Sequence, residues 1–164
     1  MIKSSHIYIH KMSLEPDSAI QPGQAYKPIC LGVLGKREDI SRTDFHERVL
    51  NPLMELIGKV PDLVYMSNDG TTSSFVNMWA DKCGIRNETV MADWRRLGRR
   101  AVVMRDARIV KEATYLLLFE QPRSEYISKI GLRELKKGKK VFSITPGKDW
   151  ELQEWETSGS CEIK

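Results

Sequence analysis

PICLGVLGKR, the stretch from residue 28 to residue 37, decides how the rest of the chain is interpreted. Its apolar run from Ile29 to Leu34 predicts a strand that is buried on both faces, as in a parallel sheet. Gly35 then predicts a turn, and Lys36 and Arg37 place two positive charges directly after it. In an open α/β sheet, the loop after the first strand lies at the crevice where ligands bind. The stretch therefore indicates either a phosphate site or simply a strand that is followed by a basic turn.

A glycine in such a loop lets backbone N–H groups approach an anion, and a helix that starts there adds partial positive charge. The stretch is not the dinucleotide fingerprint G-x-G-x-x-G, because only Gly32 and Gly35 are present and Gly32 lies inside the predicted strand. We therefore take Gly35, Lys36 and Arg37 as candidate phosphate contacts.

Composition limits the classes of protein to which the chain can belong. The 164 residues suit one domain, and 41% hydrophobic with 29% charged residues is typical of a globular protein. A net charge of +4 favours anionic partners such as nucleotides or nucleic acid. No apolar run reaches the roughly 18 residues of a membrane span, and the N-terminus lacks a signal-peptide pattern. Cys30, Cys83 and Cys161 have no metal spacing, so we expect reduced thiols and a cytoplasmic protein.

Strand and helix patterns alternate along the chain. Strands are predicted at 29–34, 63–66, 85–90, 113–119 and 140–144, and the third is the most polar, so an edge strand or a loop is expected there. The first helical pattern contains Pro52, which predicts a kink or two pieces. The order predicts a Rossmann-like α/β fold: an open, parallel, five-stranded sheet with helices on both faces. The loops after Leu34, Met66 and Phe119 should then meet at one edge.

The domain boundaries follow from this pattern. Residues 1–27 are polar and rich in proline and predict an N-terminal arm, with a disordered leader as the alternative. Residues 28–146 form the predicted nucleotide-binding domain. Residues 147–164 contain several glutamates and no long helical stripe, which predicts an acidic C-terminal tail.

Three further segments carry a resemblance to a known family. The turn at 67–72 runs into Trp79-Ala80, and the segment ADW at 92–94 is followed by GRRA at 98–101 and by Arg105-Asp106. Together with residues 31–37 they resemble the SLOG superfamily of Rossmann-like domains, and within it the YspA-like branch of uncharacterised proteins. Related members are DNA-processing protein A and the cytokinin-activating phosphoribohydrolases. The resemblance covers about residues 28 to 145 and implies a nucleotide-type ligand and a homodimer.

The chain also departs from that family pattern. The turn at 67–70 reads SNDG and lacks the usual double glycine, and Arg105-Asp106 replaces Arg-Asn. EQPRSE at 120–125 replaces a Pro-Gly-Gly-x-Gly-Thr loop. In the related phosphoribohydrolases that loop carries phosphate contacts and a catalytic glutamate, so its replacement argues against the same catalysis here.

Each candidate site residue either follows a predicted strand or lies in a segment that carries the resemblance. We expect ligand contacts from Gly35, Lys36, Arg37, Ser67, Asp69, Gly70, Thr71, Asp93, Trp94, Arg99, Arg100, Arg105 and Asp106. The arginines suit phosphates, and both Arg37 and Arg105 are expected near the surface. Asp69 is a candidate for a ribose or metal contact or for a helix N-cap, and Trp94 either stacks on a base or belongs to the core.

The favoured function is a module that senses or sequesters a nucleotide or nucleotide-derived ligand at the carboxyl edge of the sheet. The alternative is a nucleotide N-glycoside hydrolase that uses Asp69, Asp106 or Glu125. The second alternative is single-stranded nucleic-acid binding, which is not favoured because a charge of +4 is modest. No catalytic residue, metal site, cofactor or membrane partner is predicted, and a homodimer is expected.

Overall fold

The computed structural model describes residues 27–68, 70–145 and 150–157. The N-terminal arm expected at 1–27 therefore lies outside the described residues except for Lys27, and Asp69 lies outside them as well. No helix within the described ranges is long and apolar enough to cross a membrane.

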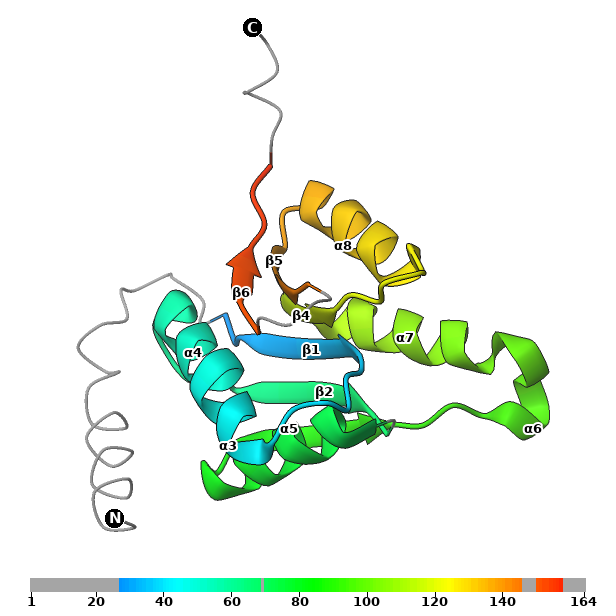
Figure 1. Ribbon diagram of the computed structural model, residues 1–164. Coiled ribbons are helices and arrows are strands. Elements are labelled where there is room, and N and C mark those ends of the chain that lie inside the picture. Colours follow the sequence, from blue (N-terminus) through cyan, green and yellow to red (C-terminus); the bar gives the residue numbers. More distant parts are fainter. Residues whose placement is uncertain (1–26, 69, 146–149, 158–164) are drawn as a thin grey trace, which may run out of the picture.

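A single six-stranded sheet forms the centre of the protein (Figure 1). Its spatial order is β3-β2-β1-β4-β5-β6. The strands are β1 (Cys30–Gly35), β2 (Leu63–Ser67), β3 (Arg86–Val90), β4 (Tyr115–Phe119), β5 (Lys140–Ile144) and β6 (Leu152–Glu154). The first five are parallel, which confirms the predicted Rossmann-like α/β class, and the polar β3 is an edge strand as expected.

The prediction of five strands is wrong by one. β6 comes from the segment that was expected to be an acidic tail, and it pairs antiparallel to β5. Two tryptophans explain why this polar segment joins the sheet. Trp150 is 8% exposed and belongs to the core, and the Trp155 Nε1–H donates to Ser143 Oγ at 2.8 Å. A short segment with few apolar residues thus obtains its stability from tertiary contacts, which periodicity does not report.

Helices cover both faces of the sheet. One face is covered by α3 (Arg42–Phe45), the π-helical turn η1 (His46–Leu50), α4 (Asn51–Ile57) and α5 (Gly70–Lys82). The other face is covered by α7 (Ala101–Glu112) and α8 (Tyr126–Lys136). Strand β1 serves both cores, because Leu31 and Val33 belong to the first cluster and Leu34 to the second.

Pro52 explains the interruption of the first helix. It has no N–H to donate to the carbonyl four residues earlier, and its ring crowds that carbonyl. The chain accommodates it with the π-helical turn at 46–50, after which α4 restarts with Pro52 in its first turn. The helical backbone thus continues from 42 to 57, and the predicted irregularity takes the form of a π-helical turn in place of a gap between two pieces.

A buried carboxylate joins α8 to the chain that enters β5. Glu134 is 1% exposed, and its carboxylate lies 2.9 Å from Arg133 Nε, 3.1 Å from Lys137 Nζ and 2.9 Å from Lys139 Nζ. Burial alone raises the pKa of Glu134, but the hydrogen bonds from Lys139, Arg133 and Lys137 outweigh it and lower the pKa to about 2. Glu134 therefore stays ionised and holds three cations together.

We expect Glu134→Gln to lower the free energy of unfolding at pH 7 by about 3 kcal/mol, because the three cations lose their counter-charge. The folded pKa is depressed from 4.5 to about 2, so this stabilisation is present above pH 4.5 and is lost as the pH falls toward 2. Urea denaturation at pH 7 and pH 3 measures both values. The deficit of the variant should shrink at pH 3, and a deficit that is equal at the two pH values would contradict the assignment. Exposed Glu55→Gln is the control.

Candidate functional site

The carboxyl ends of the parallel strands meet at one edge of the sheet. The register pairs Val33 with Met66 and Gly35 with Phe119, so the loops after β1, β2 and β4 lie together as predicted. Within the sheet, β2 lies on one side of β1 and β4 lies on the other, so the order of the strands reverses direction at β1. The β1–β4 boundary is therefore the topological switch point, where open α/β sheets bind their ligands.

Gly35 is required at the turn that leaves β1. Its φ is +84°, a conformation that favours glycine, and a Cβ there would collide with the carbonyl oxygen of Phe119. Gln121 fixes the neighbouring loop, because its Nε2 donates to the Lys36 carbonyl at 2.9 Å and to the Phe119 carbonyl at 3.2 Å. The loops after β1 and β4 are thus tied to each other.

The side chain of Lys36 lies against the first residue of α5. A Cβ added at Gly70 would be 3.0 Å from Lys36 Cβ and 3.1 Å from Lys36 Cδ, so glycine permits this close packing. Glu38 Oε2 lies 3.6 Å from the same position. Helix α5 has 13 residues, and the N-terminus of such a helix carries partial positive charge. The Lys36 side chain and the start of α5 therefore lie together, and the Glu38 carboxylate beside them offsets part of their positive charge.

A cavity of about 250 Å³ opens beside this contact. Its walls are mainly hydroxyl and amide side chains, together with the backbone at the start of α5. The lining residues are Ser67, Asn68, Gly70, Ser73, Ser74, Asn77, Met78 and Thr89. The Ser67 and Ser73 hydroxyl oxygens are 3.3 Å apart. In the same turn of α5, Thr72 Oγ1 is buried and has no hydrogen-bond partner within the described residues.

Arg37 faces away from that cavity and into a structural contact. Its Nε and Nη2 donate to Asp39 at 3.1 and 2.8 Å, Nη1 donates to the Thr145 carbonyl at 3.4 Å, and the guanidinium lies 4.5 Å from the Trp150 ring centroid. The hydrogen bond from Arg37 lowers the pKa of Asp39. The Arg37 side chain is 12% exposed, so it lies near the surface, as expected, but is largely covered. The reason is that β6 brings Trp150 back over the first loop.

Arg105 and Asp106 form a buried pair between α7 and α8. Arg105 Nε lies 3.0 Å from Asp106 Oδ1, and the Tyr126 hydroxyl donates to Asp106 Oδ2 at 3.0 Å. Burial, followed by the charge of Asp106 and this hydrogen bond, raises the pKa of Tyr126 to about 12. Tyr126 therefore remains protonated at neutral pH and keeps donating. The expected surface position of Arg105 is wrong, because its side chain is 6% exposed.

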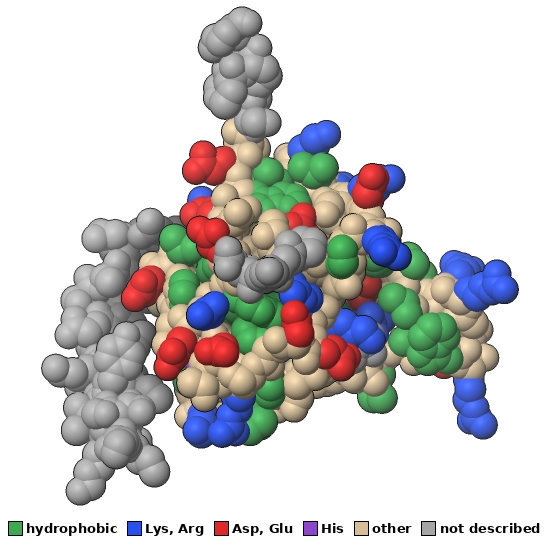
Figure 2. Space-filling view, viewed as in Figure 1, with side chains coloured by type: hydrophobic (Ala, Val, Ile, Leu, Met, Phe, Trp, Pro, Cys, Tyr) green, Lys and Arg blue, Asp and Glu red, His purple; other side chains and the backbone are tan. Residues whose placement is uncertain are grey.

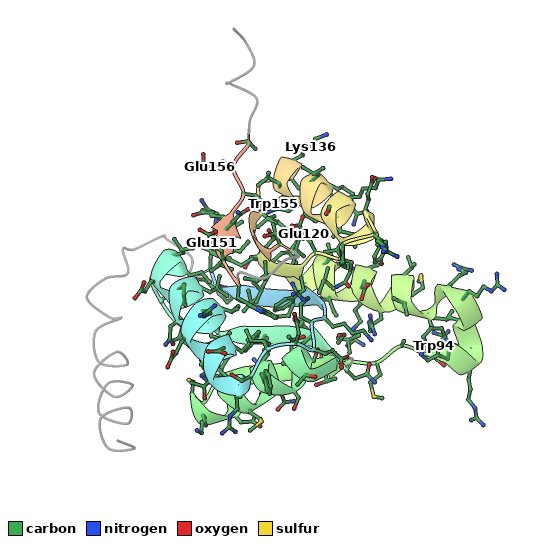
Figure 3. The ribbon with its side chains drawn as sticks, in the orientation of Figure 1. Trp94, Glu120, Lys136, Glu151, Trp155 and Glu156 are labelled. Carbon is green, nitrogen blue, oxygen red and sulfur yellow. The ribbon has the colours of Figure 1, made fainter. Side chains whose placement is uncertain are left out.

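The remaining predicted residues lie on a projection beyond the carboxyl edge, visible at the right of Figure 1. The projection contains α6 (Trp94–Leu97) and the 3-10 turn η2 (Gly98–Arg100), which leads into α7. Asp93 caps α6, because its Oδ1 accepts from the Arg96 N–H at 3.1 Å. Trp94 is 60% exposed, so the alternative that placed it in the core is wrong, and Arg99 and Arg100 are exposed too. Figure 3 shows Trp94 far from the strands.

Of the three carboxylates considered for hydrolysis, Asp69 lies outside the described residues, and the other two do not line the cavity. The Asp106 side chain is 4% exposed, and both of its oxygens are engaged by Arg105 and Tyr126. The Glu125 side chain is 82% exposed and lies 3.5 Å from Lys129 Nζ. Within the described residues, no group of three or more histidine, cysteine or acidic side chains is placed to hold a metal ion.

Of the sequence-predicted set, the structure brings together Gly35, Lys36, Ser67 and Gly70, with Thr71 in the first turn of α5. It also shows three residues that sequence reasoning missed: Gln121, Asn68 and Tyr126. The roles of Gln121 and Tyr126 depend on partners from other elements, such as Asp106 for Tyr126, and no local motif marks them, whereas Asn68 lies in the turn at 67–72 that carries the resemblance.

Comparisons with protein-family models, curated proteins and solved structures find no match to this chain. Function is therefore inferred from the geometry at the carboxyl edge and from the motifs that this edge contains.

We expect Arg37→Ala to lower the free energy of unfolding by about 1–2 kcal/mol, because it removes the cation–π contact with Trp150 and the hydrogen bond to Thr145. Guanidinium denaturation, followed by tryptophan fluorescence, measures this loss. Exposed Arg48→Ala is the control and should change stability by less than about 0.5 kcal/mol. Equal stability of wild type and Arg37→Ala would show that the Trp150 contact contributes nothing.

Proposed function

We propose that the carboxyl edge binds the phosphate end of a mononucleotide-type ligand, which the protein senses or sequesters. The observation that carries this proposal is the packing of Lys36 on Gly70 beside the cavity at the start of α5. Backbone N–H groups of a helix N-terminus and a lysine ammonium are the groups that proteins commonly use to bind phosphate. The resemblance of residues 28–145 to SLOG domains points to the same class of ligand.

The polar groups around the cavity suit a phosphate and a sugar. Ser67 and Ser73 supply hydroxyls at the carboxyl end of β2, and Asn68 supplies an amide.

The cavity volume favours a compact ligand. About 250 Å³ is below the range of about 300–1,000 Å³ that is typical of sites for drug-sized molecules. A phosphate with its ribose suits this volume better than a complete dinucleotide. This agrees with the absence of a G-x-G-x-x-G fingerprint from the first loop.

Binding is favoured over hydrolysis because neither Asp106 nor Glu125 lines the cavity, and Asp69, the third candidate, lies outside the described residues. A hydrolase needs a carboxylate beside the sugar carbon, and a displacement of about 1 Å can reduce a rate a hundredfold. Asp106 is held by Arg105 and Tyr126, and Glu125 points to solvent. In the loop after β4, the Gln121 amide holds the first loop, and Pro122 has no N–H to offer to a phosphate.

We expect Lys36→Gln to weaken mononucleotide binding by at least about tenfold, the effect of losing one charge-assisted hydrogen bond. Thermal shift identifies the ligand from a set of AMP, GMP, CMP, UMP, cyclic AMP and NAD, and calorimetry then measures its affinity. The matched control is Lys136→Gln, since Lys136 lies on α8 away from the cavity (Figure 3).

Three results would contradict the proposal. The first is that none of the compounds stabilises the protein, and the second is that Lys36→Gln and Lys136→Gln bind the ligand equally well. The third is that chromatography detects free base released at ordinary enzyme rates, which would establish the hydrolase instead.

A further inference from the structure

We propose that the projection formed by residues 91–104 docks onto a second copy of this chain, at an acidic stripe made of Glu151, Glu154 and Glu156. This contact is independent of the ligand proposed above. It gives the expected homodimer a defined surface and an occupant of stated chemistry.

The projection carries more than half of the exposed large hydrophobic residues of the described chain. Seven large hydrophobic residues are exposed in the described ranges, and four of them belong to this segment. They are Met91 at 67%, Trp94 at 60%, Val103 at 52% and Met104 at 44% exposed. Figure 2 shows apolar and basic side chains together at the projection. A clustered apolar surface of this kind marks an interaction site, whereas scattered exposed residues need no explanation.

The same segment carries exposed positive charge. Arg95, Arg96, Arg99 and Arg100 are all exposed. Within the described residues, only Arg96 has an acidic partner, Asp93 at 3.2 Å. Tryptophan, methionine and arginine are the residue types enriched in protein interfaces and their hot spots. The projection therefore has the composition of an interface whose partner is acidic.

The chain itself carries a surface of complementary charge. Glu151 directly precedes β6, Glu154 is its last residue and Glu156 follows it, and all three are exposed along this edge of the sheet. The only cation that pairs with this stripe in the described chain is Lys140, whose Nζ is 4.0 Å from Glu154. Leu152 and Trp155 lie between the glutamates in the sequence, and each is half-buried against one of the two cores. The stripe thus offers the negative charge that the projection lacks.

The projection and the stripe cannot meet within one chain. Figure 3 places Glu151 and Glu156 at one end of the molecule and Trp94 at the other. A contact between them must therefore join two copies. Projection against projection would oppose four arginines with four arginines, which electrostatics disfavours. A two-fold arrangement with the copies antiparallel places each projection on the partner's stripe and forms the contact twice, which closes the dimer.

Sedimentation velocity of the full chain over a range of concentrations tests this proposal. We expect a dimer that dissociates as salt is raised from 50 to 500 mM, where screening becomes strong. Trp94→Ala should raise the dimer dissociation constant at least about tenfold, as expected for a hot-spot residue. The pair Arg95→Glu with Arg99→Glu, and the pair Glu151→Lys with Glu156→Lys, should each do the same. All of these side chains are exposed, and circular dichroism checks that every variant is folded.

Combination of the two charge-reversing pairs gives the decisive variant. Because the reversed residues would again face opposite charges, the fourfold variant should dimerise more tightly than either pair alone. Lys136→Glu, on α8, is the control and should leave the dimer unchanged.

Four outcomes would overturn the proposal. The first is a wild type that is monomeric at every concentration, and the second is a dimer whose dissociation constant neither charge-reversing pair changes. The third is a fourfold variant that dimerises no better than either pair alone. The fourth is a wild type that forms no dimer but binds a single-stranded oligonucleotide stoichiometrically, with binding lost in Trp94→Ala, which would assign the surface to nucleic acid.

Discussion

Parallel pairing of β1 with β4 is the contact on which both the sheet and the candidate site depend. The register runs from Leu31 opposite Tyr115 to Gly35 opposite Phe119. It joins the first βαβ half of the chain to the second and places the switch point at Gly35. A side chain there would strike the Phe119 carbonyl, so glycine is what allows β1 to end at this position. The loops that carry Lys36 and Gln121 meet only because this pairing holds.

Some of the charged residues at the carboxyl edge are engaged in contacts within the protein, whereas Lys36 is exposed to solvent. Arg37 is occupied by Asp39, Thr145 and Trp150, and it thereby ties the first loop to the chain between β5 and β6. Arg105 is buried with Asp106, whose second oxygen accepts from Tyr126 on α8. The side chain of Lys36 remains exposed at the start of α5. The proposed phosphate contact therefore rests on a lysine and a helix terminus, and the two arginines hold the surrounding framework.

Sequence reasoning succeeded where the signal was local. The apolar run at 29–34, the helix irregularity at Pro52 and the polar edge strand follow from periodicity and from the chemistry of proline, and all three occur in the structure. It failed for β6 and for the burial of Arg37, which have the same cause. Trp150 and Trp155 anchor a segment whose own pattern contains little strand signal, and this segment then covers the Arg37 side chain.

The amino-acid sequence by itself determined the class of fold, the order of the five parallel strands along the chain and the place of the β1 loop at the carboxyl edge of the sheet. Hydrophobic period and turn residues act over a few positions, so they can be read without a structure. Only the tertiary structure decided which candidates meet. It packed Lys36 on Gly70, buried Arg105 with Asp106 and left Trp94 exposed on the projection. These outcomes depend on contacts between residues far apart in the chain, and no local pattern encodes such contacts.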